Sequence, residues 1–151
     1  MLGSLAKWLR ILGVDTFYPI AEMTDGELLA LSTNDNRMLL TRDKELAMRA
    51  KKLQIPVIEL HTTNLDEQLH QVLNHIQLDS KEMLTRCTLC NTVLGSVQKN
   101  KVKTHVPPKV YESRTEFWFC PVCKKYYWMG THTENMIQKI TILTKKDSAS
   151  S

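Results

Sequence analysis

Cys87-Thr88-Leu89-Cys90 and Cys120-Pro121-Val122-Cys123 decide the fold of the second half of the chain, and they contain all its cysteines. Two residues separate the thiols of each pair and roughly thirty separate the pairs, which is the spacing of a four-thiolate zinc site. Two disulfides or a redox dithiol are weaker alternatives, because nothing indicates secretion and a redox dithiol needs no matched second pair. We expect the four cysteines to hold a structural Zn²⁺, since four sulfurs leave no position open for substrate.

The composition is that of an ordinary folded chain of one or two small domains. It has 151 residues, of which 42% are hydrophobic. No apolar run approaches the ~20 residues of a membrane span. The first residues lead into an amphipathic segment containing Lys7 and Arg10, unlike a signal peptide. We expect a cytoplasmic protein with no membrane partner.

Charge is divided unevenly along the chain. Residues 1–80 hold 8 Lys and Arg and 11 Asp and Glu, a net charge of −3. Residues 81–151 hold 12 Lys and Arg and 5 Asp and Glu, a net charge of +7. A basic module favours a polyanion such as nucleic acid, but lysines that merely solubilise a small domain give the same count.

Helix and strand patterns alternate through about residue 78. Apolar spacing predicts helices over residues 2–12, 24–36, 43–53 and 65–76, and strands over residues 14–18, 37–41 and 56–60. Thr24 and Glu27 have the spacing of a capping box. This alternation predicts a first domain, residues 1–80, with helices on a mostly parallel sheet.

The pattern changes after a linker at residues 78–82. Short strands are expected over residues 93–97, 102–106, 117–119 and 126–128, around the two cysteine turns. They predict a small β-rich zinc ribbon at residues 81–144, with a last helix over residues 134–143. Residues 145–151 are polar, and we expect a disordered tail there.

Three carboxylates are candidates for a catalytic site. Asp43 follows an expected strand and opens a helix, Asp25 opens another helix, and Asp15 lies in the strand after the first helix. Ligands collect at the carboxyl ends of parallel strands, and carboxylates there can hold Mg²⁺ or Mn²⁺. The alternative is that Asp25 and Asp43 only cap their helices.

Several motifs together resemble the Mut-seven C-terminal RNase family, a branch of the PIN-like nucleases. They are residues 2–16 (LGSLAKWLRILGVDT), 39–43 (LLTRD), 86–91 (RCTLCN), 120–123 (CPVC) and 127–132 (YWMGTH). The resemblance runs from Leu2 to about Ile140. It implies a PIN-like, metal-dependent endoribonuclease core followed by a zinc ribbon. Asp43 would then be a ligand of Mg²⁺ or Mn²⁺, Asp25 a second ligand, and Asp15 a weaker candidate.

The chain departs from the family pattern at its start. Members usually begin with a strand that ends in an Asp just before the Leu-Gly of the first helix, and Met1 stands at that position. The expectation is that the true start lies upstream. The alternatives are an inactive relative that kept RNA binding, or a partner that supplies the strand.

Basic and aromatic residues are candidates for RNA contacts. Lys7, Arg10 and Arg42 could reach phosphates near the acidic residues, or simply form a solvated face. Lys124, Lys125 and Trp128 place bases beside aromatics, as in proteins that bind single-stranded RNA, although a ribbon also needs aromatics for its own core. For His132 a structural hydrogen bond is favoured over a role as a general acid.

The sequence thus predicts a ribonuclease that uses Mg²⁺ or Mn²⁺ and binds RNA partly through its zinc ribbon. The alternative is a catalytically inactive RNA-binding adaptor, or a subunit of an RNA–protein complex.

Overall fold

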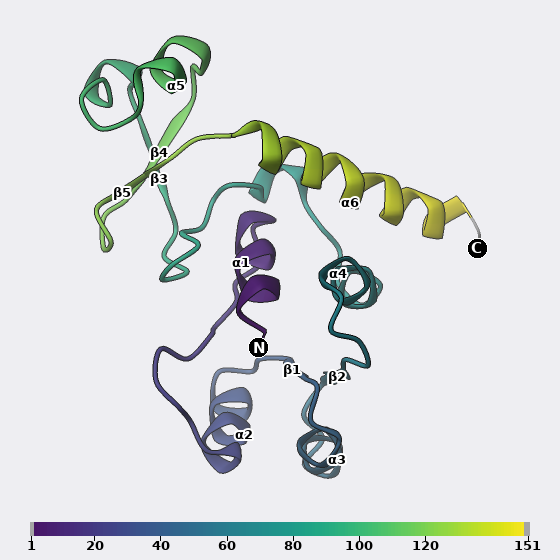
Figure 1. The fold of residues 1–151 in the computed structure, drawn as a ribbon. Helices are drawn as coiled ribbons and strands as arrows, with labels where there is room; N and C mark the ends of the chain where they lie inside the picture. The colour runs from purple at the N-terminus through teal and green to yellow at the C-terminus, as the bar shows by residue number, and fades with distance from the viewer. Residues whose placement is uncertain (1, 150–151) are drawn as a thin grey trace. The chain divides into compact units, whose positions relative to one another are not determined.

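The computed structural model describes residues 2–149, without the side-chain surroundings of Ser80 and residues 143–149. It is a mixed α/β structure with two small sheets (Figure 1). The chain forms two compact units. The first unit contains the residues up to Leu5 and Tyr18–Ile76, and the second contains Ala6–Phe17 and the chain from Gln77 onward. The division into a first domain at residues 1–80 and a zinc ribbon at residues 81–144 stays a prediction.

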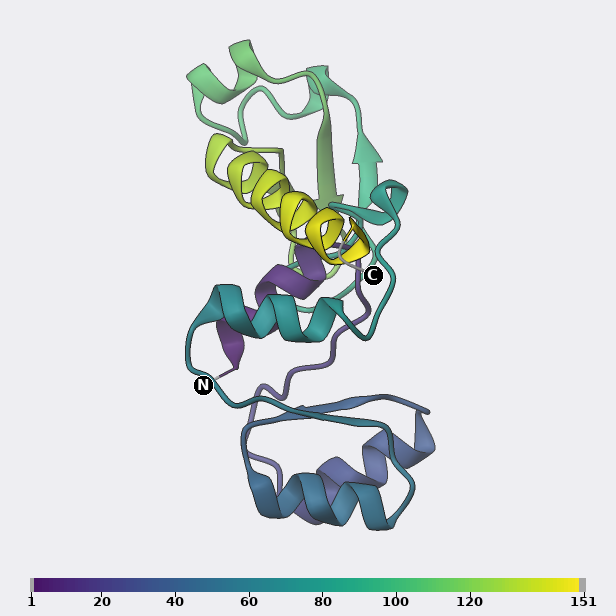
Figure 2. The same cartoon turned by 90° about the vertical axis from the view of Figure 1, so that its right-hand side faces the viewer.

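The first unit is built on a parallel pair of strands. Helix α2 (Asp25–Asn34) leads to β1 (Leu39–Thr41), α3 (Lys44–Lys52), β2 (Val57–Glu59) and α4 (Leu65–Leu73). Leu39 lies opposite Val57, and Thr41 lies opposite Glu59. Helices α2 and α3 lie on one face of the pair and α4 on the other (Figure 1, Figure 2). The prediction of helices around parallel strands is confirmed at this level, with two strands in the described sheet.

The local sequence explains these elements. Thr24 and Glu27 form the predicted capping box: the Thr24 hydroxyl accepts from the Glu27 N–H, and the Glu27 carboxylate accepts from the Thr24 N–H. The apolar residues of α2 and α3 recur at helical spacing and meet the strands. The resulting core contains Leu28, Leu29, Leu39, Leu46, Ala50, Ile55 and Val57. Burying that surface is what keeps so small a sheet folded.

The second unit contains an antiparallel sheet in the order β3-β4-β5. The strands are β3 (Gly95–Val97), β4 (Phe117–Cys120) and β5 (Lys125–Tyr127). Two short 3₁₀ helices, η1 (Ser80–Glu82) and η2 (Lys99–Lys101), and helix α5 (Pro108–Ser113) lie on the connections. The last helix is α6 (Thr131–Ala149). Helical backbone therefore covers residues 145–149 of the expected disordered tail, whereas residues 150–151 lie outside the described residues.

Each face of this sheet carries its own small core. Because side chains alternate along a strand, Phe117 and Phe119 face one way and Trp118 and Cys120 the other. One core contains Leu94, Trp118, Tyr127 and the four cysteines. The other contains Val97, Val102, Val106, Val110, Tyr111, Phe117, Tyr126 and Trp128. Most aromatics of the unit thus pack inside it.

Two predicted strands are wrong. Residues 102–106 form turns instead, in which the N–H of His105 donates to the carbonyl of Val102, and Val102 and Val106 pack under Phe117. Residues 14–18 run without strand partners. The backbone of Thr16 is bound by side chains, because its N–H donates to Asn91 and its carbonyl accepts from Arg10.

Helix α1 (Gly3–Ile11) confirms the predicted N-terminal helix, and from Ala6 onward it belongs to the second unit. Its end needs Gly13, which has a φ of +89° and leaves only 2.1 Å between a built Cβ and the carbonyl oxygen of Glu82. The N–H of Leu84 donates to the carbonyl of Ile11 at 2.8 Å. The chain after η1 is thus fastened to the end of α1. No helix in the described part of the chain is long and apolar enough to cross a membrane.

Candidate metal centre and acidic site

The two cysteine turns have the same backbone design. The N–H of Asn91 donates to the carbonyl of Cys87 at 2.9 Å, and the N–H of Lys124 donates to the carbonyl of Cys120 at 2.8 Å. Asn91 and Lys124, each directly after the second cysteine of its pair, have φ values of +70° and +58°. This left-handed residue folds each turn so that both of its thiols face the other pair.

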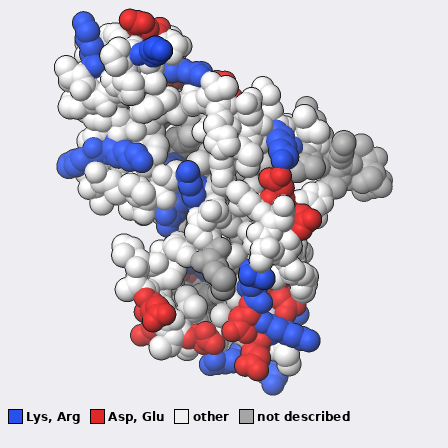
Figure 3. All heavy atoms as spheres, in the orientation of Figure 1, with Lys and Arg blue, Asp and Glu red and all other residues white. Residues whose placement is uncertain are grey.

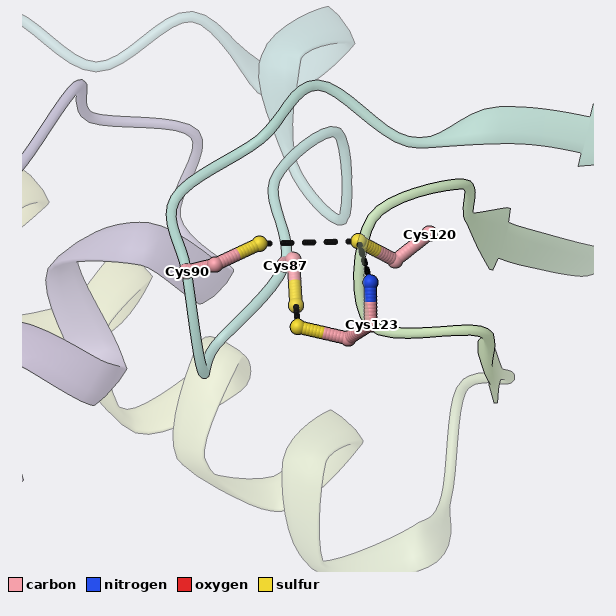
Figure 4. A group of neighbouring side chains, drawn as sticks. All are labelled: Cys87, Cys90, Cys120 and Cys123. Carbon is pink, nitrogen blue, oxygen red and sulfur yellow. Dashed lines mark hydrogen bonds between the residues drawn. The ribbon is translucent and has the colours of Figure 1, made fainter.

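The turns bring all four sulfurs together (Figure 4). The four Sγ atoms lie within 4.8 Å of one another, with Cys87 and Cys123 3.8 Å apart and Cys90 and Cys120 3.5 Å apart. A zinc tetrahedron with Zn–S bonds of ~2.3 Å has sulfurs ~3.8 Å apart. A disulfide requires ~2.05 Å, and all four cysteines are free thiols. The four cysteines could therefore bind a structural zinc.

Burial and neighbouring groups shift the pKa values of three of the four thiols. Burial raises the pKa of the Cys90 thiol, but hydrogen bonds with the side chain and the backbone of Thr92 outweigh burial and lower that pKa to about 6. The hydrogen bond to Cys90, burial and the nearby Cys87 raise the pKa of Cys123 to about 12. Burial raises the pKa of Cys120 as well. So many thiolates cannot lie this close unless a cation balances them.

Tyr127 supports this cluster from β5. Its hydroxyl lies 3.0 Å from Sγ of Cys87 and accepts from the N–H of Thr88 at 3.3 Å. Burial and the contact with Cys87 raise the pKa of Tyr127 to about 12, so the phenol keeps the proton that it can donate to sulfur. Our sequence analysis missed this contact. The available signal was the alternation in β5, which places Tyr127 on the face of the sheet that carries Cys120.

Asp43 caps helix α3, as the plainer interpretation of the sequence held. Its Oδ1 accepts from the N–H groups of Glu45 at 2.9 Å and Leu46 at 3.2 Å. Its Oδ2 has no hydrogen-bond partner among the described residues, and the side chain is exposed. Asp43 follows β1 at the carboxyl end of the parallel pair, where ligands are expected.

Glu59 is a further carboxylate at that edge. It lies opposite Thr41 in the register of β1 and β2, and its carboxylate is 3.7 Å from His61. Sequence analysis did not select it, although an acidic residue at the end of the second strand was a usable signal.

Asp25 and Asp15 have other partners. Asp25, in the first turn of α2, is 3.7 Å from the guanidinium of Arg49. Asp15 accepts from the Nδ2 of Asn91 at 2.6 Å and lies 3.9 Å from Arg86. Among the side chains that the structure describes, the four cysteines are the one group of three or more Cys, His, Asp or Glu that could share a metal ion. The catalytic roles of Asp15, Asp25 and Asp43 stay predictions.

The residues expected to contact RNA differ in exposure. Lys7, Arg42, Lys124 and Lys125 are exposed, and Trp128 is half-buried against the core around Phe117. The expectation that Arg10 lies on a solvated helix face or contacts phosphates is wrong, because Arg10 is only 6% exposed. Its guanidinium donates to the carbonyls of Thr16 at 2.9 Å and Thr88 at 2.8 Å. Arg10 therefore holds the first cysteine turn to the segment after α1.

His132 lies at the start of α6 and is exposed. Its ring meets the ring of Trp8 edge-on, with centroids 5.7 Å apart. This contact links α6 to α1, and the predicted structural hydrogen bond stays a prediction.

Comparison with known proteins agrees with these features. The family model described as the Mut7-C RNAse domain matches residues 1–140. That range includes both strands of the parallel pair and both cysteine turns. No curated protein and no solved structure matches the chain significantly.

Proposed function

The chain belongs to the Mut7-C RNAse domain family, and we propose that it is a metal-dependent endoribonuclease that hydrolyses RNA phosphodiesters in the cytoplasm. The observation that carries this proposal is the match of the RNase family over residues 1–140. The structure adds the parallel pair with acidic residues at its carboxyl end and the four-thiol cluster. In this proposal, the first unit is a PIN-like core and the second contains a zinc ribbon.

Asp43 is the principal ligand of Mg²⁺ or Mn²⁺ in the proposed site. The proposed roles of Asp25 and Asp15 rest on the family resemblance alone. Its Oδ1 is held by two backbone N–H groups, which orients the carboxylate and leaves Oδ2 for the ion. Such an ion would lower the pKa of a bound water and offset the charge of the scissile phosphate. Asp43 positions the ion, and exposed Arg42, its neighbour in the chain, binds a flanking phosphate. Exposed Lys7 is a further proposed RNA contact. On the ribbon, Lys124 is the proposed RNA contact, whereas Lys125 lies beside Tyr127 and Trp128 packs in the core around Phe117.

Substitution of Asp43 by Asn tests this proposal sharply. Asn removes the charge but still caps α3, because its side-chain oxygen accepts the same two hydrogen bonds. We expect cleavage of a labelled single-stranded RNA in Mn²⁺ to fall at least ~100-fold, since a carboxylate ligand is lost. RNA affinity should stay equal or rise, because a negative charge is removed.

Asp79→Asn is the matched control. Asp79 also caps a helix, with its Oδ1 accepting from the N–H of Lys81 at 2.9 Å. This variant loses the same charge at the same kind of position and should cleave like the unaltered chain. Equal cleavage by Asp43→Asn and Asp79→Asn would contradict the proposed site.

The partners of the three aspartates favour the second candidate, an RNA-binding adaptor or complex subunit. Asp25 has Arg49 beside it, Asp15 is bound by Asn91, and Asp43 caps α3. Under this alternative, the zinc-loaded chain binds RNA but leaves it intact at every concentration of Mn²⁺.

A further inference from the structure

We propose that one face of the β4–β5 hairpin binds bases of single-stranded RNA through a stack formed by Phe119, Tyr126 and His105, with Lys124 binding a phosphate of the same strand. This face is called the stacking face below. The inference rests on the proposed function for its partner, RNA. It assigns RNA to one side of the sheet and identifies two residues, Phe119 and His105, that no sequence motif indicated.

The stacking face is an ordered set of rings. Phe119 and Tyr126 are direct cross-strand neighbours, and their ring centroids lie 4.8 Å apart. The His105 ring lies almost parallel to that of Tyr126, at 16°, with a centroid distance of 4.8 Å. His105 itself is exposed. The stack therefore ends in solvent with a flat ring, on which a base can continue it.

Lys124 gives this face its positive charge. Its Nζ lies 5.9 Å from the centroid of Phe119, whereas the Nζ of Lys125 lies 5.4 Å from the centroid of Tyr127, which faces the cysteine cluster. The two neighbouring lysines thus belong to opposite faces of the sheet. Lys124 lies at the Phe119 end of the ring series and His105 at the other end, so Lys124 would bind a phosphate of the same strand on a nucleotide other than the one stacked on His105.

The other large aromatics of the unit are committed to packing. Trp118 and Tyr127 pack around the thiols, and Tyr111 and Trp128 pack around Val102, Val106 and Phe117. His105 and Phe119 belong to neither core. Burial of the other rings explains why the stacking face, and not Trp128, carries the expected base contacts.

Charge favours RNA over a protein partner. Residues 81–151 carry a net charge of +7. Lys and Arg prevail over the part of the surface that carries β3, β4, β5 and α5 (Figure 3). An acidic peptide would satisfy the charge but would not use the His105 ring, which is stacked on Tyr126 and exposed, whereas the Phe119 ring is tilted by 43° to Tyr126. Unpaired bases satisfy both, whereas the bases of a duplex are already stacked.

The test measures the affinity of the zinc-loaded full chain for a fluorescein-labelled, 12-nucleotide single-stranded RNA, by anisotropy in Mg²⁺-free buffer. His105→Ala and Phe119→Leu should each weaken binding about tenfold, within the range for loss of one stacked base. Lys124→Gln should weaken binding by a similar factor and reduce its dependence on salt. His105 is exposed, so its variant keeps the fold.

Lys125→Gln is the matched control, because it removes the same charge one residue away on the other face. We expect a loss below roughly threefold, through general electrostatics alone. Equal losses for the two lysine variants, or unchanged affinity of His105→Ala and Phe119→Leu, would overturn the stacking face. The proposal would also be overturned if an RNA duplex bound as tightly as the single strand. Binding of a polyglutamate peptide that is lost in His105→Ala, Phe119→Leu and Lys124→Gln would overturn it as well.

Cleavage in Mn²⁺ at saturating RNA is measured on the same proteins. Cleavage that persists in variants with unchanged affinity would refute the stacking face and leave the nuclease intact. Weakened binding in the three variants of a chain that never cleaves would support the stacking face and refute the nuclease.

Discussion

Single side chains in this protein connect parts of the chain that are far apart in the sequence. Asn91 illustrates this: its backbone takes the left-handed conformation that closes the first cysteine turn, and its side chain binds Thr16 and Asp15. Arg10 reaches the carbonyl of Thr88 on the same turn. Asp15 and Arg10, which the sequence suggests as ligand-binding residues, thus form hydrogen bonds with other parts of the chain.

Tyr127 provides a prediction at this scale. Tyr127→Phe removes the hydroxyl that lies 3.0 Å from the Cys87 sulfur. We expect zinc still to bind at one ion per chain, but about 10- to 100-fold more weakly, as for other groups that support metal ligands. Competition against a chromogenic zinc chelator measures the change.

Tyr126→Phe is the control for that experiment. Tyr126 is the neighbouring residue on the opposite face of the sheet, packed in the core around Phe117. The Tyr126→Phe variant should bind zinc as tightly as the unaltered chain. Equal zinc affinities of Tyr126→Phe and Tyr127→Phe would disprove the role of the Tyr127 hydroxyl.

At the scale of elements, the sequence predicted most helices and strands because their apolar spacing is local. The predicted helix at residues 65–76 is α4, and the predicted strands at residues 37–41 and 56–60 contain β1 and β2. The incorrect predictions concern apolar segments whose conformation depends on residues that are distant in the sequence. Val102 and Val106 alternate like a strand but pack under Phe117 from a turn. Helix α5, which begins at the second of two consecutive prolines, was not predicted at all.

The missing strand at residues 14–18 leads to a prediction about coupling. Thr16 is held by Asn91 on the first cysteine turn, so order in this segment should depend on the turn. Asn91→Gly keeps the φ of +70° accessible but removes the side chain. The amide of Thr16 should then exchange roughly fivefold faster in hydrogen-exchange NMR, because a lost hydrogen bond costs about 1 kcal/mol.

Removal of zinc by a chelator should accelerate hydrogen exchange of the Thr16 amide in the unaltered chain. Lys124→Gly changes the equivalent position of the second turn and should leave the Thr16 amide unaffected. Unchanged exchange at Thr16 in Asn91→Gly would show that the turn does not order this segment.

At the scale of the whole molecule, charge and chemistry are divided along the chain. Residues 1–80 carry a net charge of −3 and contain the proposed carboxylates, whereas residues 81–151 carry +7 and contain the thiols. The sequence sufficed for the family and the four-cysteine cluster, since both depend on motifs with fixed spacing. It could not assign partners to Asp15, Asp25 or Arg10, because each partner is supplied by a different part of the chain.

The central claim is that this chain cleaves RNA with the help of Mg²⁺ or Mn²⁺, and the most direct measurement is single-turnover cleavage of an end-labelled single-stranded RNA by the zinc-loaded chain. We expect fragments to appear only when Mn²⁺ or Mg²⁺ is added. Their ends should lack a 2′,3′-cyclic phosphate, because water and not the ribose hydroxyl attacks the phosphate. RNA that is bound but remains intact at every concentration of either metal ion would contradict the claim and identify the chain as an RNA-binding adaptor.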